Sequence, residues 1–355
     1  MAALGAVRRS IPDARGTITC TSRHSGQRTG VVFRSVCAHR ARVTTPDISA
    51  PASTPIATIA IVTYHKAPNL TPDDALVVQP LAERGVRVVP VQWADESADW
   101  SAFDAVVLRS CWEYYREEAR FLAWLDRLDA AGVPVWNSTA TVRWNARKTY
   151  LVELAERGVR TIPSEHVPCG APTTLADIRR LTGWGELVVK PVVSAGAFET
   201  WRVPALTTDE DERRFAEFIA ARDTIVQPFL PEIAEGEWSF IFFHGELSHA
   251  VRKRPVSGDF RVQPQYGGVT TKETPGDELV AQAAAILAAA PDGVERAPLY
   301  ARVDACEVGG ELLLMELEII EPQLFFVCDP ESPARFADAV VRALDVARTA
   351  RVRGA

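Results

Sequence analysis

Three carboxylates, Asp304, Glu316 and Glu318, interrupt two apolar, strand-like runs near the C-terminal end of the chain. The Gly309–Gly310 pair separates the runs, and adjacent glycines between two strands indicate a hairpin. Side chains two positions apart on a strand share a face, so Glu316 and Glu318 point the same way. Crowded carboxylates repel one another unless a cation joins them, and Mg2+ binds carboxylate oxygens. The pattern therefore predicts either a magnesium site or a hairpin with one solvated polar face.

The length of the hairpin loop sets which residues face one another. A loop of 309–311 would pair Val308 with Leu312 and place Asp304 opposite Glu316. The other face of the second strand is then expected to carry Met315, Leu317 and Ile319.

Two lysines and a small-residue loop could bind an anion. Lys190 ends the apolar strand-like run 186–190, and a buried ammonium is costly unless an anion meets it. We therefore expect an anion there, phosphate included. Lys148 falls on a predicted helix over 146–157, and for this lysine alone solvent exposure is the favoured interpretation. The loop 194–197 is built of small residues, which let backbone N–H groups close on phosphates.

Cations follow in the second half of the chain. Residues 252–254 (Arg-Lys-Arg) end a predicted strand, and Arg261 follows in a polar loop. Four cations within ten positions can clamp phosphate or carboxylate oxygens, or they can form a solvated basic edge. Arg302 shares a strand face with Asp304, where it could orient a carboxylate or form a salt bridge.

The elements that must position these residues change character along the chain. The first part alternates strands with helices, which predicts a parallel sheet covered on both faces. Its strands are expected at 58–63, 86–92, 104–109 and 133–136, and its helices at 71–84 and 116–130. The second part is expected to be α+β with antiparallel strands. Its predicted elements are strands at 186–190 and 225–230, a hairpin over 238–251 turning at His244–Gly245, and helices at 277–290 and 332–350.

Composition excludes several classes of protein. With 355 residues the chain should form two or three domains. The net charge of −7, without a basic stripe in the body, disfavours nucleic acid as a partner, and no apolar run is long enough to span a membrane. Six scattered cysteines fit a reducing, cytoplasmic setting.

Residues 1–56 differ from the rest of the sequence. The first 55 residues hold eight Arg and two Asp, without hydrophobic periodicity. We expect a disordered basic extension. A tail without function, or a start codon placed too early, is favoured over an organelle transit peptide.

The order of these features resembles the ATP-grasp superfamily of carboxylate–amine ligases over about 57–345. The glutathione synthetase and ribosomal-protein glutamate ligase branch is the most similar, and within it the cycloserine-synthetase-like proteins. The segments that carry the resemblance are R-W-N-A-R-K (143–148), Q-P-F-L-P-E-I (227–233) and M-E-L-E-I-I-E-P (315–322).

The resemblance implies a fold and its domains. An ATP-grasp protein of this kind combines α/β and α+β parts: a Rossmann-like parallel-sheet domain, then two α+β subdomains that sandwich ATP. The implied boundaries are 57–138 for the first domain, 139–228 for the first ATP-grasp subdomain with its linker helix, and 229–350 for the second, which carries the metal site.

The resemblance also implies residue roles. Residues matching nucleotide contacts are Lys148 and Lys190 for phosphates, Ser194 and Gly196 in a loop that covers them, Gln227, Phe229 and Leu230 at the adenine hinge, and Glu237 at the ribose. Residues matching the phosphoryl and acyl region are Arg254, Arg261 and Arg302. Residues matching metal ligands are Asp304, Glu316 and Glu318.

Three departures from the family pattern stand out. Pro228 occupies a position where many relatives have Glu, and Glu318 one where most have Asn. Both Asn and Glu offer oxygen to Mg2+. The phosphate loop is short and has one glycine.

The implied activity is an ATP- and Mg2+-dependent ligase that activates a carboxylate as an acyl phosphate for attack by an amine. Two Mg2+ ions are expected, with Mn2+ as a substitute. The expected partner is an amino-acid-like small molecule, with a homodimer as the oligomer and no nucleic acid or membrane. A nucleotide-binding protein without turnover and a small-molecule phosphotransferase are the alternatives. Five residues could line the substrate pocket but are not assigned to a ligand: Tyr64, His65, Arg109, Trp112 and Gln265.

Overall fold

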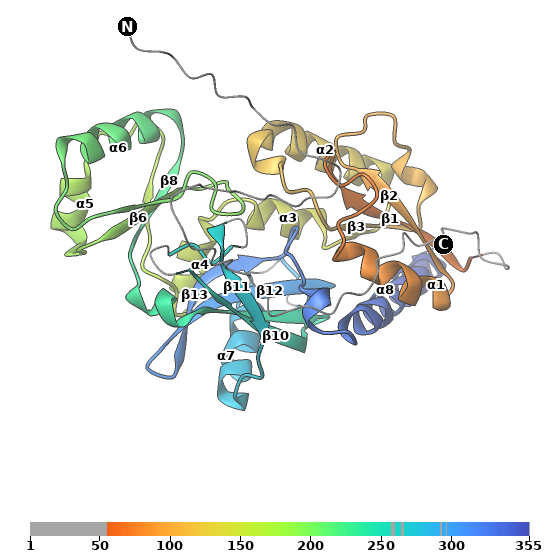
Figure 1. Ribbon diagram of the computed structural model, residues 1–355. Coiled ribbons are helices and arrows are strands. Elements are labelled where there is room, and N and C mark those ends of the chain that lie inside the picture. The colour runs from red at the N-terminus through yellow and green to blue at the C-terminus, as the bar shows by residue number, and fades with distance from the viewer. Residues whose placement is uncertain (1–54, 257–259, 264–265, 292, 296, 355) are drawn as a thin grey trace, which may run out of the picture. The chain divides into compact units, whose positions relative to one another are not determined.

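The computed structural model describes residues 55–256, 260–263, 266–291, 293–295 and 297–354 (Figure 1). Residues 1–54 of the predicted basic extension, and Gln265, therefore lie outside the described residues. Within the described part, no helix is both long and apolar enough to cross a membrane.

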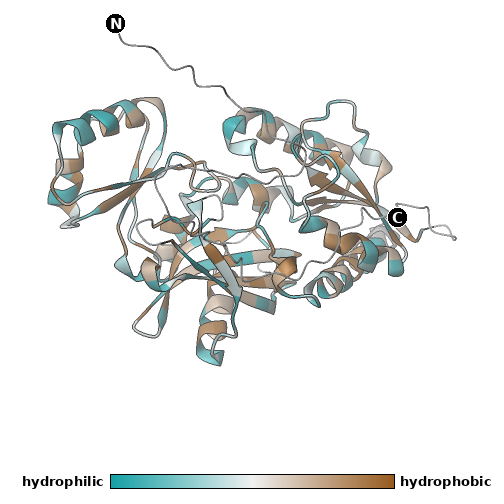
Figure 2. Ribbon diagram, in the orientation of Figure 1, coloured by the Kyte–Doolittle hydropathy of each residue, from teal (hydrophilic) through white to brown (hydrophobic). Residues whose placement is uncertain are grey.

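The first sheet is parallel, as predicted, with strand order β2-β1-β3-β4. Its strands are β1 (Ala57–Thr63), β2 (Val86–Gln92), β3 (Ala105–Leu108) and β4 (Val135–Trp136). The central strands are buried on both faces, because their runs of Val, Ile, Leu and Ala have no polar alternation. Figure 2 shows this as apolar colour along β1 and β3.

Helices cover both faces of this sheet. One face packs against α2 (Glu118–Ala131), which buries Phe121, Trp124 and Leu128. The other face packs against α1 (Val78–Glu83), the short 3-10 turn η1 (Asp74–Val77) and the C-terminal helix α8 (Ser332–Gly354). The predicted covering on both faces is confirmed. The sequence did not indicate that α8, which begins more than 200 residues after α1 and α2 end, would supply part of it.

The second sheet is antiparallel with order β5-β8-β6-β7. Its strands are β5 (Glu165–Val167), β6 (Leu187–Pro191), β7 (Trp201–Val203) and β8 (Thr224–Pro228). Helices α5 (Leu175–Thr182) and α6 (Asp209–Ala221) pack on it through Leu175, Ile178, Phe215 and Ile219. Each helix begins at a threonine whose side chain and a following aspartate cap one another's backbone N–H groups, which fixes where the helix starts.

The third sheet is antiparallel with order β11-β10-β9-β12-β13. Its strands are β9 (Glu237–Phe243), β10 (Glu246–Arg254), β11 (Val269–Lys272), β12 (Tyr300–Val308) and β13 (Glu311–Glu318). The hairpin of β9 and β10 turns at His244–Gly245 as predicted, with φ angles of 50° and 78°. Helices α4 (Tyr150–Glu156) and α7 (Asp277–Ala288) bury one face of this sheet, which leaves the other face for ionisable side chains.

The predicted helix over 146–157 is wrong at its start. Helix α3 (Thr139–Asn145) ends before it, and α4 begins only at Tyr150, so Lys148 lies in a turn between two helices. The Lys148 N–H donates to the Val192 carbonyl at 2.9 Å instead of to a helical carbonyl. A contact with the start of the phosphate loop therefore interrupts the helix. The remaining 3-10 turns are η2 (Trp100–Ala102), η3 (Tyr114–Arg116), η4 (Pro231–Glu235) and η6 (Phe326–Cys328).

Candidate active site

The β12–β13 hairpin brings the predicted carboxylates together, but by a different register. The loop is Gly309–Gly310 alone, with φ angles of 63° and 83°, so Val308 pairs with Glu311 and the predicted Val308–Leu312 pairing is wrong. Asp304 nevertheless lies opposite Glu316, as predicted, because the register shifts by one residue between Asp304 and Ala305. This β-bulge restores the pairing that the shorter loop would have lost.

The bulge also changes where Met315 lies. Ala305 pairs with Leu314 and Asp304 with Glu316, which leaves Met315 as the extra residue of β13. Met315 packs with Ile233 and Cys306 on the same side as Glu316. The prediction that Met315 shares a face with Leu317 and Ile319 is therefore wrong, since only those two residues join the core on the other face.

A cavity of about 580 Å³ opens over this hairpin. Its walls come from β6, β8, β13, the phosphate loop and the segment before α2. The sequence-predicted site residues that line it are Lys148, Lys190, Ser194, Gly196, Gln227, Phe229, Leu230, Glu237, Arg261, Arg302, Asp304, Glu316 and Glu318.

Both predicted phosphate lysines contact Glu316. Lys148 Nζ and Lys190 Nζ lie 3.1 and 3.2 Å from the same oxygen, Oε1. Burial lowers the pKa of Lys190, although Glu316 opposes this. Burial would raise the pKa of Glu316, but the two lysines outweigh it and hold the pKa at about 2. The interpretation of Lys148 as a solvent-exposed side chain is wrong, because it is 8 % exposed.

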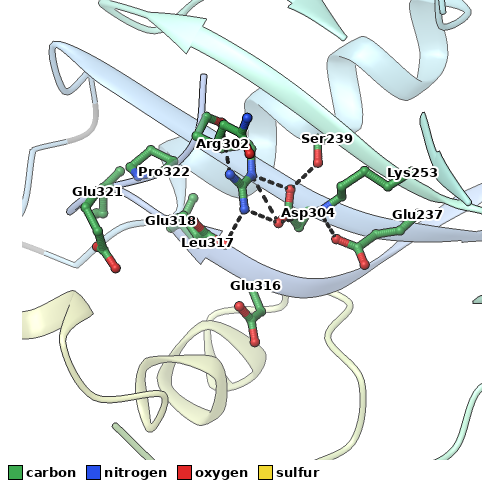
Figure 3. Close-up of polar contacts among 12 residues, drawn as sticks. Glu237, Ser239, Lys253, Arg302, Asp304, Glu316, Leu317, Glu318, Glu321 and Pro322 are labelled. Atoms are coloured by element: carbon green, nitrogen blue, oxygen red, sulfur yellow. Dashed lines mark hydrogen bonds and ion pairs between the residues drawn. The ribbon is translucent and has the colours of Figure 1, made fainter. Parts of the chain in front are cut away.

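On β12, the strand next to β13, Asp304 lies among cations (Figure 3). Arg302 donates to both of its oxygens, with Nε–Oδ1 at 2.9 Å and Nη2–Oδ2 at 2.8 Å. Lys253 Nζ lies 3.1 Å from Oδ2, and Ser239 donates to Oδ1 at 2.5 Å. Burial would raise the pKa of Asp304, but Arg302 and Lys253 outweigh it and keep the carboxyl ionised at neutral pH. Arg302 also forms an ion pair with Glu318.

The three predicted metal ligands fit Mg2+ in chemistry and location. All are carboxylates on adjacent strands that face one cavity, and hard cations prefer such oxygens. Their side chains are turned toward cations, however: Glu316 toward two lysines, and Asp304 and Glu318 toward Arg302. Accordingly, the described residues contain no group of three or more His, Cys, Asp or Glu already arranged around a metal position.

Lys253 takes the inward position that the sequence analysis gave to Arg254. Strand alternation turns Lys253 into the sheet, where it contacts Glu237 as well as Asp304. Burial, only partly offset by Lys253, raises the pKa of Glu237 to about 7. Arg254 instead pairs with Glu273 at 2.5 Å and is not among the described residues that line the cavity, so its predicted place beside the transferred phosphoryl group stays a prediction. The period-two pattern of β10 could have separated the two.

The predicted adenine hinge forms an apolar end of the cavity. Phe229, Leu230 and Met315 pack around Ile233 and Val262. The Phe229 N–H already donates to the Glu186 carbonyl at 2.8 Å, and the Gln227 side chain donates to Ser164 at 2.8 Å. These contacts hold the hinge to the residues just before β6 and β5, and the apolar surface suits a flat aromatic base.

The predicted phosphate loop reaches the first domain. Gly196 and Ala197 have φ angles of 59° and 58°, a conformation that glycine adopts more easily than alanine. The following residue, Phe198, lies with its ring centroid 4.8 Å from that of Tyr115. The Arg116 guanidinium lies 5.4 Å from the centre of the Phe198 ring. The loop therefore meets the segment before α2 on the cavity wall.

The chain is similar to known proteins in sequence and in fold. Residues 59–137 match the family model described as the N-terminal domain of D-cycloserine synthetase DcsG. The cycloserine biosynthesis protein DcsG of Streptomyces lavendulae is 29% identical over 271 residues, which cover 73% of this chain and 90% of that protein. The crystal structure of D-cycloserine synthetase DcsG superposes with a TM-score of 0.73 and 27% identity, covering 81% of this chain and 99% of that one. The chain is an ATP-grasp ligase.

More distant structures agree with the fold. An ATP-complexed D-alanine–D-alanine ligase from Bacillus anthracis has a TM-score of 0.58 at 14% identity, covering 82% of this chain and 99% of that one. A RimK domain ATP-grasp protein from Sphaerobacter thermophilus has a TM-score of 0.58 at 18% identity, covering 80% and 100%. The ligase thus has the predicted ATP-grasp fold.

The residues left unassigned in the sequence lie in different places. Trp112 lines the cavity of the ligase. Arg109 does not, because it is buried in an ion pair with Asp74 at 3.0 Å. The Tyr64 and Trp112 rings lie tilted to one another with centroids 5.6 Å apart, and His65 pairs with Glu113. Neither Tyr64 nor His65 is among the described residues that line the cavity.

Among the cavity residues, Lys253 was named in the sequence analysis only as one cation of the 252–254 run, and Glu321 was given no role. Glu321 belongs to the M-E-L-E-I-I-E-P segment but had no assigned role. It is 8 % exposed, and burial together with the nearby Glu318 raises its pKa to about 8. Its carbonyl accepts a hydrogen bond from Trp112 Nε1 at 3.1 Å, which ties this segment to the first domain.

Proposed function

We propose that this ligase activates the carboxylate of an amino-acid-like small molecule with ATP and joins it to an amine, and that it does so by closing a ring within one molecule. The observation that carries the proposal is the convergence of Lys148 and Lys190 on Glu316 inside one cavity. It supports the proposal because the two cations expected to bind phosphate lie beside an acid expected to bind the metal. The similarity to D-cycloserine synthetase along most of both chains favours ring closure over joining two molecules.

The substrate carboxylate must be activated because it is a poor electrophile at neutral pH. A carboxylate oxygen attacks the γ-phosphorus of ATP and ADP leaves, which forms an acyl phosphate. The amine then attacks the acyl carbon, and phosphate leaves with the bonding electrons. In this class of phosphoryl transfer the protein acts mainly by positioning and by stabilising charge.

The residues of the cavity divide these tasks. Lys148 and Lys190 would bind phosphate oxygens, and the apolar hinge around Phe229 would bind adenine, with Glu237 at the ribose. Asp304, Glu316 and Glu318 would hold Mg2+, as two ions that Mn2+ can replace. When bound, the metal neutralises phosphate charge.

Arginines and the phosphate loop would act on the acyl group and its surroundings. Arg261 and Arg302 line the cavity beside the acids and would orient the carboxylate and stabilise the oxyanion formed on amine attack. The loop around Ser194 and Gly196 would exclude water, which otherwise hydrolyses the acyl phosphate.

The test is release of ADP combined with trapping by hydroxylamine. Wild type, Glu316→Gln, Lys190→Met and the control Glu331→Gln are incubated with ATP, Mg2+ and a panel of D- and L-amino acids. Glu331 is a matched control because its carboxylate is exposed, one residue before α8. We expect hydroxamate from wild type and the control, with at least a hundredfold loss in the other two variants. A stable phosphorylated acceptor would indicate a phosphotransferase instead, and equal turnover in all four proteins would reject the site.

A further inference from the structure

Some carboxylates that line the cavity form an ion pair with a lysine or arginine of the protein, and one does not do so with any described residue. Glu237 pairs with Lys253, Asp304 with Arg302 and Lys253, Glu316 with both lysines, and Glu318 with Arg302. Glu321 is the fifth acid on the wall. Among the residues that the structure describes, no side chain forms a hydrogen bond or ion pair with its carboxylate.

Glu321 is positioned by its neighbours rather than by its own charge. It follows β13, where Trp112 Nε1 donates to its backbone carbonyl at 3.1 Å. Burial and then the Glu321 carboxylate raise the pKa of Tyr114. Trp112, Tyr114 and Tyr115 line the same cavity. Glu321 therefore stands at the aromatic wall, where residues of the first domain meet the end of β13. In Figure 3 its side chain extends away from the Arg302–Asp304 cluster.

A buried carboxylate without a partner is costly, so Glu321, with a pKa of about 8, largely keeps its proton at neutral pH until a cation reaches the carboxyl group. Lys148, Arg302 and the residue's own backbone N–H favour the ionised form, but burial and the repulsion from Glu318 outweigh them. An ammonium group is small enough to bind to one carboxylate, and adjacent aromatic faces favour a cation further. An uncharged or anionic ligand group would leave the carboxylate uncompensated.

We propose that Glu321 binds the amino group of the substrate and so selects acids that carry an amine. This inference rests on the proposed function only in naming the ligand as an amino-acid-like acid. It assigns Glu321 a binding contact with a ligand group, whereas the other four cavity acids contact protein cations in the absence of ligand.

The test compares probes that differ only by an amino group. D-cycloserine is paired with isoxazolidin-3-one, the same ring without the amine, and D-serine with 3-hydroxypropionate. Binding of each probe to the full chain is measured by calorimetry for wild type, Glu321→Gln and the control Glu331→Gln. We expect wild type and the control to prefer at least one amine-bearing probe by tenfold or more. We expect the preference in Glu321→Gln to fall below threefold.

Two outcomes overturn the proposal: a wild type that binds neither amine-bearing probe more tightly than its partner, and a Glu321→Gln variant that keeps the full preference. Thermal melting checks that Glu321→Gln is folded. If it is not, Glu321→Asp replaces it, and this variant should keep the amine preference while binding each amine more weakly. Hydroxamate formation by wild type separates this test from that of the proposed function. A ligase that forms hydroxamate but shows no role for Glu321 refutes only the amine contact, and amine binding without hydroxamate refutes only the reaction.

Discussion

Lys190 Nζ lies 3.2 Å from Glu316 Oε1, although the two residues are 126 positions apart. Lys148 Nζ reaches the same oxygen at 3.1 Å. Without nucleotide, the acid expected to hold Mg2+ is thus the anion that holds both phosphate-binding lysines. Phosphate oxygens that bind these lysines would release Glu316 toward the metal, so nucleotide and Mg2+ should bind cooperatively.

Replacing Glu316 by Gln should therefore change nucleotide binding in opposite directions with and without metal. In EDTA, the variant should bind a non-hydrolysable ATP analogue about tenfold more tightly than wild type, because the buried lysines no longer have a carboxylate partner. When Mg2+ is added, wild type should gain further affinity for the analogue, and the variant should lose most of this gain. Calorimetry measures both, with Glu331→Gln as the control. Metal-free affinity equal to or weaker than that of wild type would contradict the exchange of partners.

Two adjacent cations of β10 should differ sharply in their contribution to stability. Lys253→Met leaves buried Glu237 and Asp304 with fewer cations and should lower the free energy of unfolding by about 3–5 kcal/mol. Arg254→Met removes an ion pair whose arginine is 43% exposed, and it should cost less than about 1 kcal/mol. Urea unfolding of the two variants makes the comparison. Equal losses would show that Lys253 does not point inward.

The ion pair of Arg109 with Asp74 should be structural rather than catalytic. Both side chains are almost fully buried, and Arg109 Nη2 also donates to the Pro322 carbonyl at 2.6 Å. Arg109→Met should cost about 3–5 kcal/mol, because it leaves an ionised Asp74 buried. The double variant Arg109→Met, Asp74→Leu should recover part of that loss. Denaturant midpoints test this, and a double variant less stable than the single one would refute the explanation.

His249 should make the stability depend on pH. It is 5 % exposed, and burial lowers its pKa to about 4, although Asp329 opposes the shift while Arg335 and Lys272 add to it. Between pH 4 and 6.5 the unfolded chain therefore binds more protons at this residue than the folded protein does. The free energy of unfolding should rise with pH across this interval, and the contribution of His249 should reach its full value above pH 6.5.

On acidification to pH 4, His249 should lower the free energy of unfolding by about 3 kcal/mol. Unfolding in urea at pH 4.5 and 7 measures it in wild type and in His249→Gln. The glutamine side chain can donate to the Leu324 carbonyl, which His249 Nε2 contacts at 2.9 Å. The variant should show a smaller difference in stability between the two pH values, and an unchanged difference would exclude His249 as its source.

The β12–β13 hairpin shows which features can be predicted from local sequence and which cannot. Alternation and the glycine pair were enough to predict that Asp304 faces Glu316. The loop length was wrong by one residue, and the bulge at Met315 corrected the register. A bulge is set by packing against neighbouring strands, which the sequence of the hairpin alone does not reveal.

The same division holds for the lysines. The apolar run before Lys190 indicated a buried ammonium, because that cost depends on local burial. Lys148 has no such run, and its burial depends on a turn whose N–H bonds to Val192, 44 residues away in the chain.

The sequence by itself determined the class of each sheet and the kinds of donor in the site, because hydrophobic periodicity and side-chain chemistry are local properties. Only the tertiary structure decided which cation meets which acid, that Lys253 rather than Arg254 turns inward, and that Glu321 faces the cavity without a partner among the described side chains. Those relations join residues from separate elements, and the strength of an ion pair depends on the distance and burial that folding alone creates.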